Sequence, residues 1–180
     1  MAVAACVLAL VGSGCGGGSG ATAPASPPAS GAPGPAATGQ AATGQAAPEG
    51  QVYDATRDAP ADVNAALALA RADGRRVLID FGANWCPDCL VLDRLYRNPQ
   101  VAAVLQQRYH VVTVDIGHGE RNRDLSQRYG DVTANGIPAL VVLDAHGNVV
   151  TTTKDGSFAD ARSMTPADVN GFLLRWAGTA

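Results

Sequence analysis

Charge is distributed unevenly along this chain, and this limits where the chain can fold. All of its charged side chains, 13 Lys and Arg and 16 Asp and Glu among 180 residues, lie at or after Glu49. Residues 1–50 contain 15 Ala, 11 Gly and 6 Pro, so they offer few side chains large enough to pack a core. We therefore expect the folded part in the remaining stretch of about 130 residues, a length that suits one domain.

The first residues predict export. Residues 1–11 form an apolar run with the length of a signal-peptide core, too short to cross a bilayer as a helix. The run Gly12-Ser13-Gly14-Cys15 is similar to a bacterial lipoprotein processing site. We predict a signal peptide over 1–15, cleavage before Cys15 and a lipid on that cysteine. Ordinary cleavage within 21–25, which would give a soluble secreted protein, is the alternative.

Residues 16–51 are rich in Gly, Ala and Pro and include three short repeats that start at Ala36. Such a composition predicts a disordered linker rather than a repeat fold. A linker of this kind would span about 30 to 35 Å. It would tether a domain over 52–180 to the membrane.

The remaining sequence alternates helical and strand patterns, which predicts an α/β fold with a mixed sheet covered on both faces. Asp58 and Gly74 are expected to cap the first helix, and Thr165 with Asp168 forms a capping-box pattern at the last one. We expect helices over 60–73, 86–96, 98–108, 121–129 and 166–176, and strands over 76–81, 109–116, 139–143 and 148–152.

The predicted domain contains two cysteines, Cys86 and Cys89, because Cys6 and Cys15 belong to the leader. A zinc site needs about four ligands, and the histidines His110, His118 and His146 have no paired ligand spacing, so we predict no metal. A structural disulfide across so short a loop would add little stability. A C-x-x-C motif directly after a buried strand, at the start of a helix, favours redox chemistry.

The spacing of the two cysteines has a physical reason. Residues i and i+3 lie on one face of the first helical turn, so the two sulfurs can reach disulfide distance. Cys86 meets the positive end of the helix dipole, which favours a thiolate and makes it the expected nucleophile. Cys89 is the expected resolving thiol. Pro87 suits the first turn, and Asp88 either raises the pKa of Cys86 or complements the helix N-terminus.

At these residues the chain resembles a known family. The segment Val77-Leu78-Ile79-Asp80-Phe81-Gly82-Ala83-Asn84-Trp85-Cys86-Pro87-Asp88-Cys89 and the segment Gly136-Ile137-Pro138-Ala139-Leu140 resemble the active-site and cis-proline segments of thioredoxin-like proteins. The likeness covers roughly 52–177. It is nearest to the periplasmic C-terminal domains of transmembrane thiol reductases of the DsbD type and to thioredoxin-like lipoproteins. The resemblance implies a thioredoxin fold.

The resemblance also assigns roles to single residues. Asp80 matches the buried acid that relays a proton to the resolving thiol, Trp85 matches the tryptophan beside the nucleophile, and Pro138 matches the cis-proline. Ile137 would offer its backbone to an extended substrate strand. The alternatives are that Asp80 faces water at a strand end, that Trp85 belongs to the core and that the bond before Pro138 is trans.

The sequence departs from the family pattern at several places. Pro87-Asp88 replaces Gly-Pro, and Gly82 replaces an aromatic residue that usually precedes Ala83. Polar loops at 117–120 and 154–163 either shape the choice of partner or are inert decoration, and we favour the second interpretation.

Together these features predict a membrane-tethered extracytoplasmic thiol–disulfide oxidoreductase that reduces the disulfides of other proteins. Its redox group would be the Cys86–Cys89 disulfide with no further cofactor, its electrons would come from a transmembrane thiol donor, and it would be a monomer. The net charge of −3, with interleaved signs, argues against nucleic acid as a partner. A disulfide oxidase or isomerase is the first alternative, and a non-catalytic copper-binding or adaptor module is the second.

Overall fold

The computed structural model describes residues 51–178. The predicted signal peptide, its lipidation site Cys15 and nearly all of the predicted linker lie outside this range. Within the described part, no helix combines the length and the apolar character that a membrane span requires.

Four strands form one mixed sheet in the order β2-β1-β3-β4. The central strand β1 (Arg76–Gly82) runs parallel to β2 (Tyr109–Asp115) and antiparallel to β3 (Ala139–Leu143). The short strand β4 (Val149–Thr152) pairs antiparallel with β3 at one edge. The continuous apolar run of β1 matches its position, because a strand with neighbours on both sides and helices on both faces is buried throughout.

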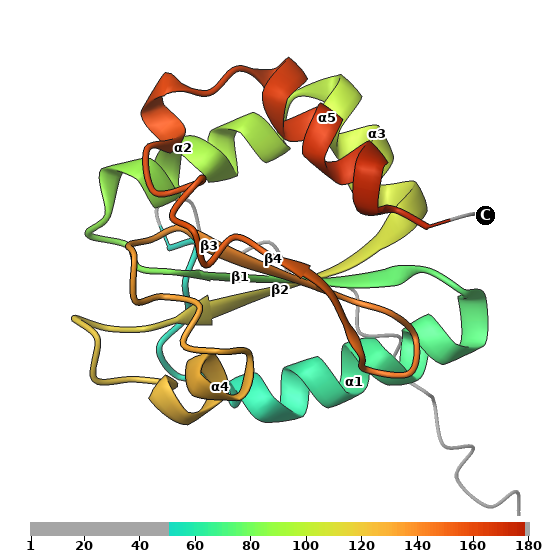
Figure 1. Ribbon diagram of the computed structural model, residues 1–180, viewed down its shortest axis with the longest axis horizontal. Helices are drawn as coiled ribbons and strands as arrows, with labels where there is room; N and C mark the ends of the chain where they lie inside the picture. The colour runs from blue at the N-terminus through green and yellow to red at the C-terminus, as the bar shows by residue number, and fades with distance from the viewer. Residues whose placement is uncertain (1–50, 179–180) are drawn as a thin grey trace, which may run out of the picture. The chain divides into compact units, whose positions relative to one another are not determined.

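Helices cover both faces of this sheet, as Figure 1 shows, and this agrees with the predicted architecture. On one face lie α1 (Ala59–Asp73) and α4 (Arg123–Arg128). On the other lie α2 (Pro87–Tyr96), α3 (Pro99–Arg108) and α5 (Pro166–Trp176), and a short 3-10 turn, η1 (Ala161–Ser163), precedes α5.

The helix ends follow the predicted capping residues. The Asp58 carboxylate accepts the backbone N–H of Ala61, 3.1 Å away, at the start of α1. Gly74 ends that helix with φ of 78°, a conformation that side chains with a Cβ rarely adopt. Thr165 and Asp168 form the capping box of α5. The cap predictions are therefore confirmed.

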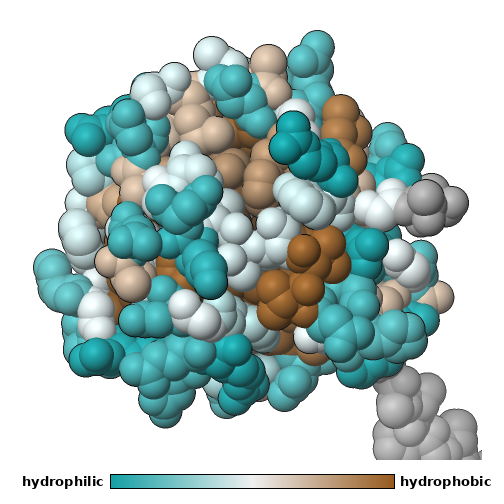
Figure 2. All heavy atoms as spheres, viewed as in Figure 1, coloured by the Kyte–Doolittle hydropathy of each residue, from teal (hydrophilic) through white to brown (hydrophobic). Residues whose placement is uncertain are grey.

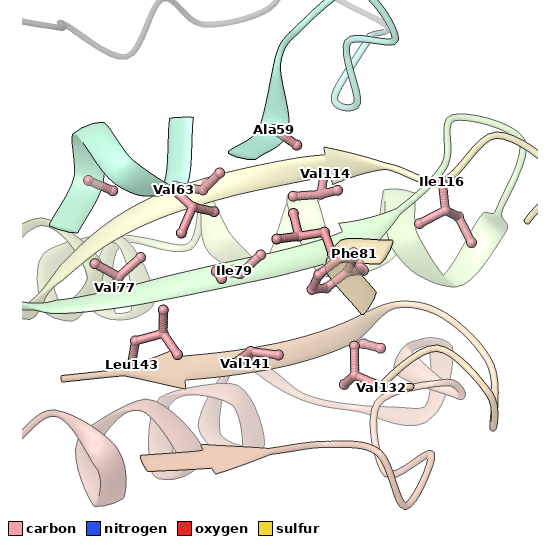
Figure 3. Packing of buried hydrophobic residues seen from close by; sticks show 14 of the residues in the cluster. Ala59, Val63, Val77, Ile79, Phe81, Val114, Ile116, Val132, Val141 and Leu143 are labelled. Carbon is pink, nitrogen blue, oxygen red and sulfur yellow. The ribbon is translucent and has the colours of Figure 1, made fainter. Parts of the chain in front are cut away.

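Alternate residues of β1 point to opposite faces of the sheet. Figure 3 shows Val77, Ile79 and Phe81 in the core that α1 covers. Leu78 belongs to the second core, between the sheet and α2, α3 and α5. Asp80 follows Leu78 at the strand period of two, so its carboxyl group lies under the helix that carries the cysteines.

Some predicted boundaries differ from the observed ones. The helix expected over 121–129 begins only at Arg123, because Asn122 has a left-handed backbone with φ of 51°. The strand expected from residue 148 begins at Val149, since Asn148 belongs to the turn and bonds Asp144 through its side chain and backbone.

Polar residues dominate the outer surface seen in Figure 2, where hydrophobic residues form only small groups between hydrophilic ones. This distribution agrees with charges that interleave along the folded part of the sequence.

Candidate active site

The first cysteine lies where β1 has ended and α2 begins. Cys86 is the N-cap residue of α2, with Pro87 in the first turn. The backbone N–H of Cys89 donates to the Cys86 sulfur at 3.3 Å, and the Cys86 thiol donates to the carbonyl oxygen of Ile137 at 3.5 Å. Both cysteines are free thiols. At this cap position an otherwise unpaired backbone N–H group points at the Cys86 sulfur.

The second cysteine lies one turn further along α2 and is completely buried. Burial raises the pKa of the Cys89 thiol above its usual range, and the hydrogen bond with Cys86 and the nearby charge of Asp80 act in the same direction. A thiol of this kind stays protonated at neutral pH. It therefore needs a base before it can attack a disulfide.

The buried carboxyl group of Asp80 can serve as that base. Its residue is 1% exposed, so the alternative of a water-facing strand end is wrong. Burial raises the pKa of Asp80 to about 7; the hydrogen bond from Tyr53 opposes this rise, and the negative charge of Asp93 adds to it. A carboxyl group with such a pKa exchanges its proton near neutral pH.

The loop before β3 completes the site. The peptide bond between Ile137 and Pro138 is cis, as the resemblance implies, so the trans alternative is wrong. The Ile137 carbonyl faces the Cys86 thiol through the contact given above. Gly136 precedes it with φ of 111°, and a Cβ there would lie 2.8 Å from the side chain of Ala159. A side chain at Gly136 would therefore collide with Ala159 and displace the loop that carries Ile137 and Pro138.

Trp85 is not part of the core, contrary to one of the alternatives, because 54% of its surface is exposed. Its indole N–H donates to the carbonyl oxygen of Gly117 at 2.7 Å. Its ring stacks on His118, with centroids 5.2 Å apart and planes 8° from parallel. The 117–120 loop therefore contacts the residue next to the nucleophile, and the interpretation of this loop as inert decoration stays a prediction.

Asp88 lies between the two cysteines in the sequence, and its buried carboxylate is paired with Arg162. One carboxylate oxygen accepts the backbone N–H of Arg162 at 2.9 Å and its guanidinium Nε at 3.0 Å. Phe158 and Ala161 of the same loop are buried in the second core. The 154–163 loop is thus anchored on the cysteine helix, and its interpretation as inert decoration stays a prediction. The predicted effect of Asp88 on Cys86 stays a prediction.

Comparison with known proteins agrees with this geometry. A family profile described as thioredoxin-like matches residues 58–145. The thioredoxin of Buchnera aphidicola subsp. Schizaphis graminum is 30% identical over 94 residues, which cover 52% of this chain and 78% of that protein. The chain belongs to the thioredoxin-like family.

Further relatives of this thioredoxin-like chain support the prediction of a thiol–disulfide oxidoreductase. A disulphide isomerase from Xylella fastidiosa Temecula1, known from its crystal structure, shares 41% sequence identity with this chain, and the two structures superpose with a TM-score of 0.67. The match covers 69% of this chain and 95% of that one. The thiol:disulfide interchange protein DsbD 2 of Pseudomonas aeruginosa is 30% identical over 123 residues, which are 67% of this chain. The chain spans about a fifth of the length of that DsbD relative, 19%.

Several residues of the thioredoxin-like site were not predicted from the sequence. They are Tyr53, Asn84, Asp93, Tyr96 and Arg162. Asp93 follows Cys89 by four residues, so helical spacing alone indicates that it shares the face that looks toward Asp80. Gly82 gave an indirect signal for Tyr53, because a missing side chain beside the motif leaves space for another one. For Tyr96 and Arg162 we find no signal in the local sequence.

Proposed function

We propose that this chain is an extracytoplasmic thiol–disulfide oxidoreductase that reduces disulfides in other proteins. Cys86 acts as the nucleophile, Cys89 as the resolving thiol and Asp80 as the acceptor of the Cys89 proton. The observation that carries the proposal is the combination of two free thiols one helical turn apart with a buried carboxyl group whose pKa is about 7.

The reaction starts at the Cys86 sulfur. Its thiolate attacks one sulfur of the substrate disulfide, the S–S bond breaks, and the first substrate sulfur leaves as a thiolate. Cys89 then gives its proton to Asp80 and attacks the Cys86 sulfur. The mixed disulfide breaks, the second substrate sulfur departs and takes up a proton, and a Cys86–Cys89 disulfide remains. The substrate has gained the two electrons that the dithiol has lost.

A substrate would bind as an extended strand beside Ile137 and Pro138. The main chain of Ile137 lies next to the nucleophile, so backbone hydrogen bonds made there would bring a substrate disulfide to Cys86. The exposed ring of Trp85 and the adjacent Pro87 would supply apolar contact area. Such main-chain recognition tolerates many sequences, as a reductant of several proteins requires.

The proposed domain is attached to a membrane and receives electrons from a donor protein. The predicted leader and the predicted lipid on Cys15 would hold the domain at the outer side of a bacterial membrane through the predicted linker. A reductase in an oxidising compartment needs a supply of electrons, so a transmembrane thiol donor would reduce the Cys86–Cys89 disulfide. The interchange function named for the DsbD relatives supports this assignment. The domain would act as a monomer without a bound cofactor or metal.

The direct test is a trap for the mixed disulfide. In Cys89→Ala, expressed in the native host, substrates should stay covalently bound to Cys86 because no resolving thiol remains. Mass spectrometry of the complexes should identify proteins with disulfides, and reduction should release them. The matched control is the double variant Cys86→Ser with Cys89→Ala, which should trap nothing. Equal recovery from both variants, or from neither, would contradict the proposal.

A second candidate is the same exchange chemistry in the service of disulfide formation or isomerisation. The observation that favours it is the 41% identity with the disulphide isomerase of Xylella fastidiosa. The reduction potential of the Cys86–Cys89 pair separates the candidates. A reductase should lie near the value of thioredoxin, about −270 mV, and an oxidase near that of DsbA, about −120 mV. Equilibration with glutathione or dithiothreitol buffers measures it.

A further inference from the structure

The residue after Phe81 leaves an opening above the buried carboxyl group. Gly82 follows Asp80 by two positions on β1, so a side chain at Gly82 would project from the same face of the sheet. The ring of Tyr53 occupies that space. A Cβ at Gly82 would lie only 2.3 Å from the ring carbon Cζ of Tyr53 and 2.5 Å from its hydroxyl oxygen. Only glycine allows this ring to lie where it does.

The segment that carries Tyr53 is fixed by the active-site segment itself. The Asn84 side-chain oxygen accepts the backbone N–H groups of Val52 and Tyr53, at 3.0 and 3.1 Å. The Asn84 side-chain nitrogen donates to the carbonyl oxygen of Tyr53 at 2.6 Å. Asn84 lies two residues before Cys86. Three hydrogen bonds from a single side chain thus hold Tyr53 in a fixed place beside the dithiol.

The hydroxyl group of Tyr53 reaches the proposed base. It donates to the Asp80 carboxylate at 3.2 Å. Tyr53 is 1% exposed and packs in one cluster with Cys86, Cys89 and the half-buried Ile137. The ring therefore keeps water from the carboxyl group, and its hydroxyl supplies a neutral donor in place of that water.

We propose that Tyr53 is a positioning residue of the dithiol site: its ring closes the space above Gly82 and its hydroxyl holds the Asp80 carboxylate as the acceptor of the Cys89 proton. This inference rests on the proposed thiol–disulfide exchange. It gives Tyr53, which precedes α1 and lies 27 residues before Asp80, a role in positioning the proton acceptor.

The groups around Asp80 determine what the loss of this hydroxyl does. From α2, Cys89, Asp93 and Tyr96 face the carboxyl group. The neighbours on the flanking strands are the uncharged Thr113 and Leu140. The hydroxyl groups of Tyr53 and Tyr96 stabilise the ionised carboxylate, whereas the charge of Asp93 destabilises it. Without the Tyr53 hydroxyl, Asp80 should hold its proton up to a higher pH.

The test is Tyr53→Phe, which keeps the ring and removes the hydroxyl. The reduced protein is mixed rapidly with a chromogenic aromatic disulfide. The first half of the reagent is released when Cys86 attacks, and the second when Cys89 resolves the mixed disulfide. In the variant, the pH midpoint of the second phase should rise by about one unit, which is about tenfold slower resolution below the midpoint. The rate of the first phase should stay within about threefold.

The matched control is Tyr109→Phe. Tyr109 is also buried, and its hydroxyl donates to the carbonyl oxygen of Leu173 at 2.7 Å, a contact of β2 with α5 that does not involve the dithiol. Its loss should lower stability without moving either phase. A Tyr53→Phe variant with the wild-type pH midpoint would overturn the inference. A wild-type protein that shows no second phase would instead overturn the proposed function, so the two failures are distinguishable.

A second pair of variants tests the position of the ring by the melting temperature. Gly82→Ala alone should destabilise the protein, because the added methyl group collides with the Tyr53 ring. In a Tyr53→Ala background the same change should cost little, since the colliding atoms are gone. A strongly non-additive cycle supports the inference. Additive effects would contradict it, because the ring would then not occupy the space above Gly82.

Discussion

Two buried aspartates flank the dithiol, and the protein surrounds them differently. Asp80, on β1, accepts a hydrogen bond from the neutral hydroxyl of Tyr53, and burial raises its pKa to about 7. Asp88, on α2, receives the backbone N–H and the guanidinium of Arg162. The same side chain, at similar burial, is thus the proposed proton acceptor in one place and half of an ion pair in the other. Partners, rather than burial alone, decide what a buried carboxyl group does.

The difference between the two aspartates predicts that the largest effect of a substitution is at Asp80. Asp80→Asn removes the proposed proton acceptor, so resolution of the mixed disulfide by Cys89 should slow by about 100-fold near pH 7, while the attack by Cys86 persists. Rapid mixing with the aromatic disulfide separates the two steps. An unchanged second phase would show that Cys89 does not depend on this carboxyl group.

The same substitution should increase stability in alkaline solution. Folding raises the pKa of Asp80 from 3.8 to about 7, so the folded protein keeps a proton that the unfolded chain has lost. Stability therefore falls as the pH rises from about 4 to about 7 and is level above that. The change that Asp80→Asn makes in the free energy of unfolding should therefore be roughly 4 kcal/mol more stabilising at about pH 8 than at about pH 4. Urea unfolding at both pH values measures this; equal effects at the two pH values would refute it.

Asp88 should behave in the opposite way. Asp88→Ala leaves the Arg162 groups without their acceptor and should cost about 2 to 3 kcal/mol of stability. Loss of a negative charge beside Cys86 should also make the potential less reducing by about 10 to 30 mV. The pH midpoint of resolution should stay in place. A midpoint that moves as far as in Tyr53→Phe would erase the distinction between the two aspartates.

A smaller effect is expected for Arg162→Gln. This variant keeps the backbone N–H on Asp88 and removes the guanidinium, most of which is exposed. Stability should fall by about 1 kcal/mol, and the potential should become more reducing by roughly 10 mV because the charge of Asp88 is less compensated. A shift toward a less reducing potential would show that Asp88 does not act on Cys86 by its charge.

The smallest effect concerns the neighbour of Asp80 on α2. The charge of Asp93 raises the pKa of Asp80, although Arg97 partly compensates it through an ion pair at 2.8 Å. Asp93→Asn should therefore lower the pH midpoint of resolution by about half a unit or less. An upward shift would mean that Asp93 acts through structure rather than charge.

The sequence predicted the features that local patterns encode. The resemblance predicted a buried Asp80, and cap residues predicted the starts of α1 and α5. The cysteine spacing placed both thiols on one helical turn. These are contacts between residues close in the chain or repeated at a fixed period.

The missed contacts join segments that are far apart and carry no such pattern. Tyr53 bonds a residue 27 positions later, and Arg162 bonds one 74 positions earlier. Tyr53 lies before the first helix and Arg162 in the three-residue 3-10 turn η1, so periodicity gives no register for either. Only Gly82 and Asp93 offered signals, through a missing side chain and through helical spacing.

One measurement tests the central claim most directly: the pH dependence of the two release phases when the wild-type reduced protein meets the aromatic disulfide. We expect a second phase that speeds up with a midpoint near the Asp80 pKa of about 7 and that disappears in Cys89→Ala, where the first phase remains. A single phase in the wild type, or a second phase that survives the loss of Cys89, would contradict it.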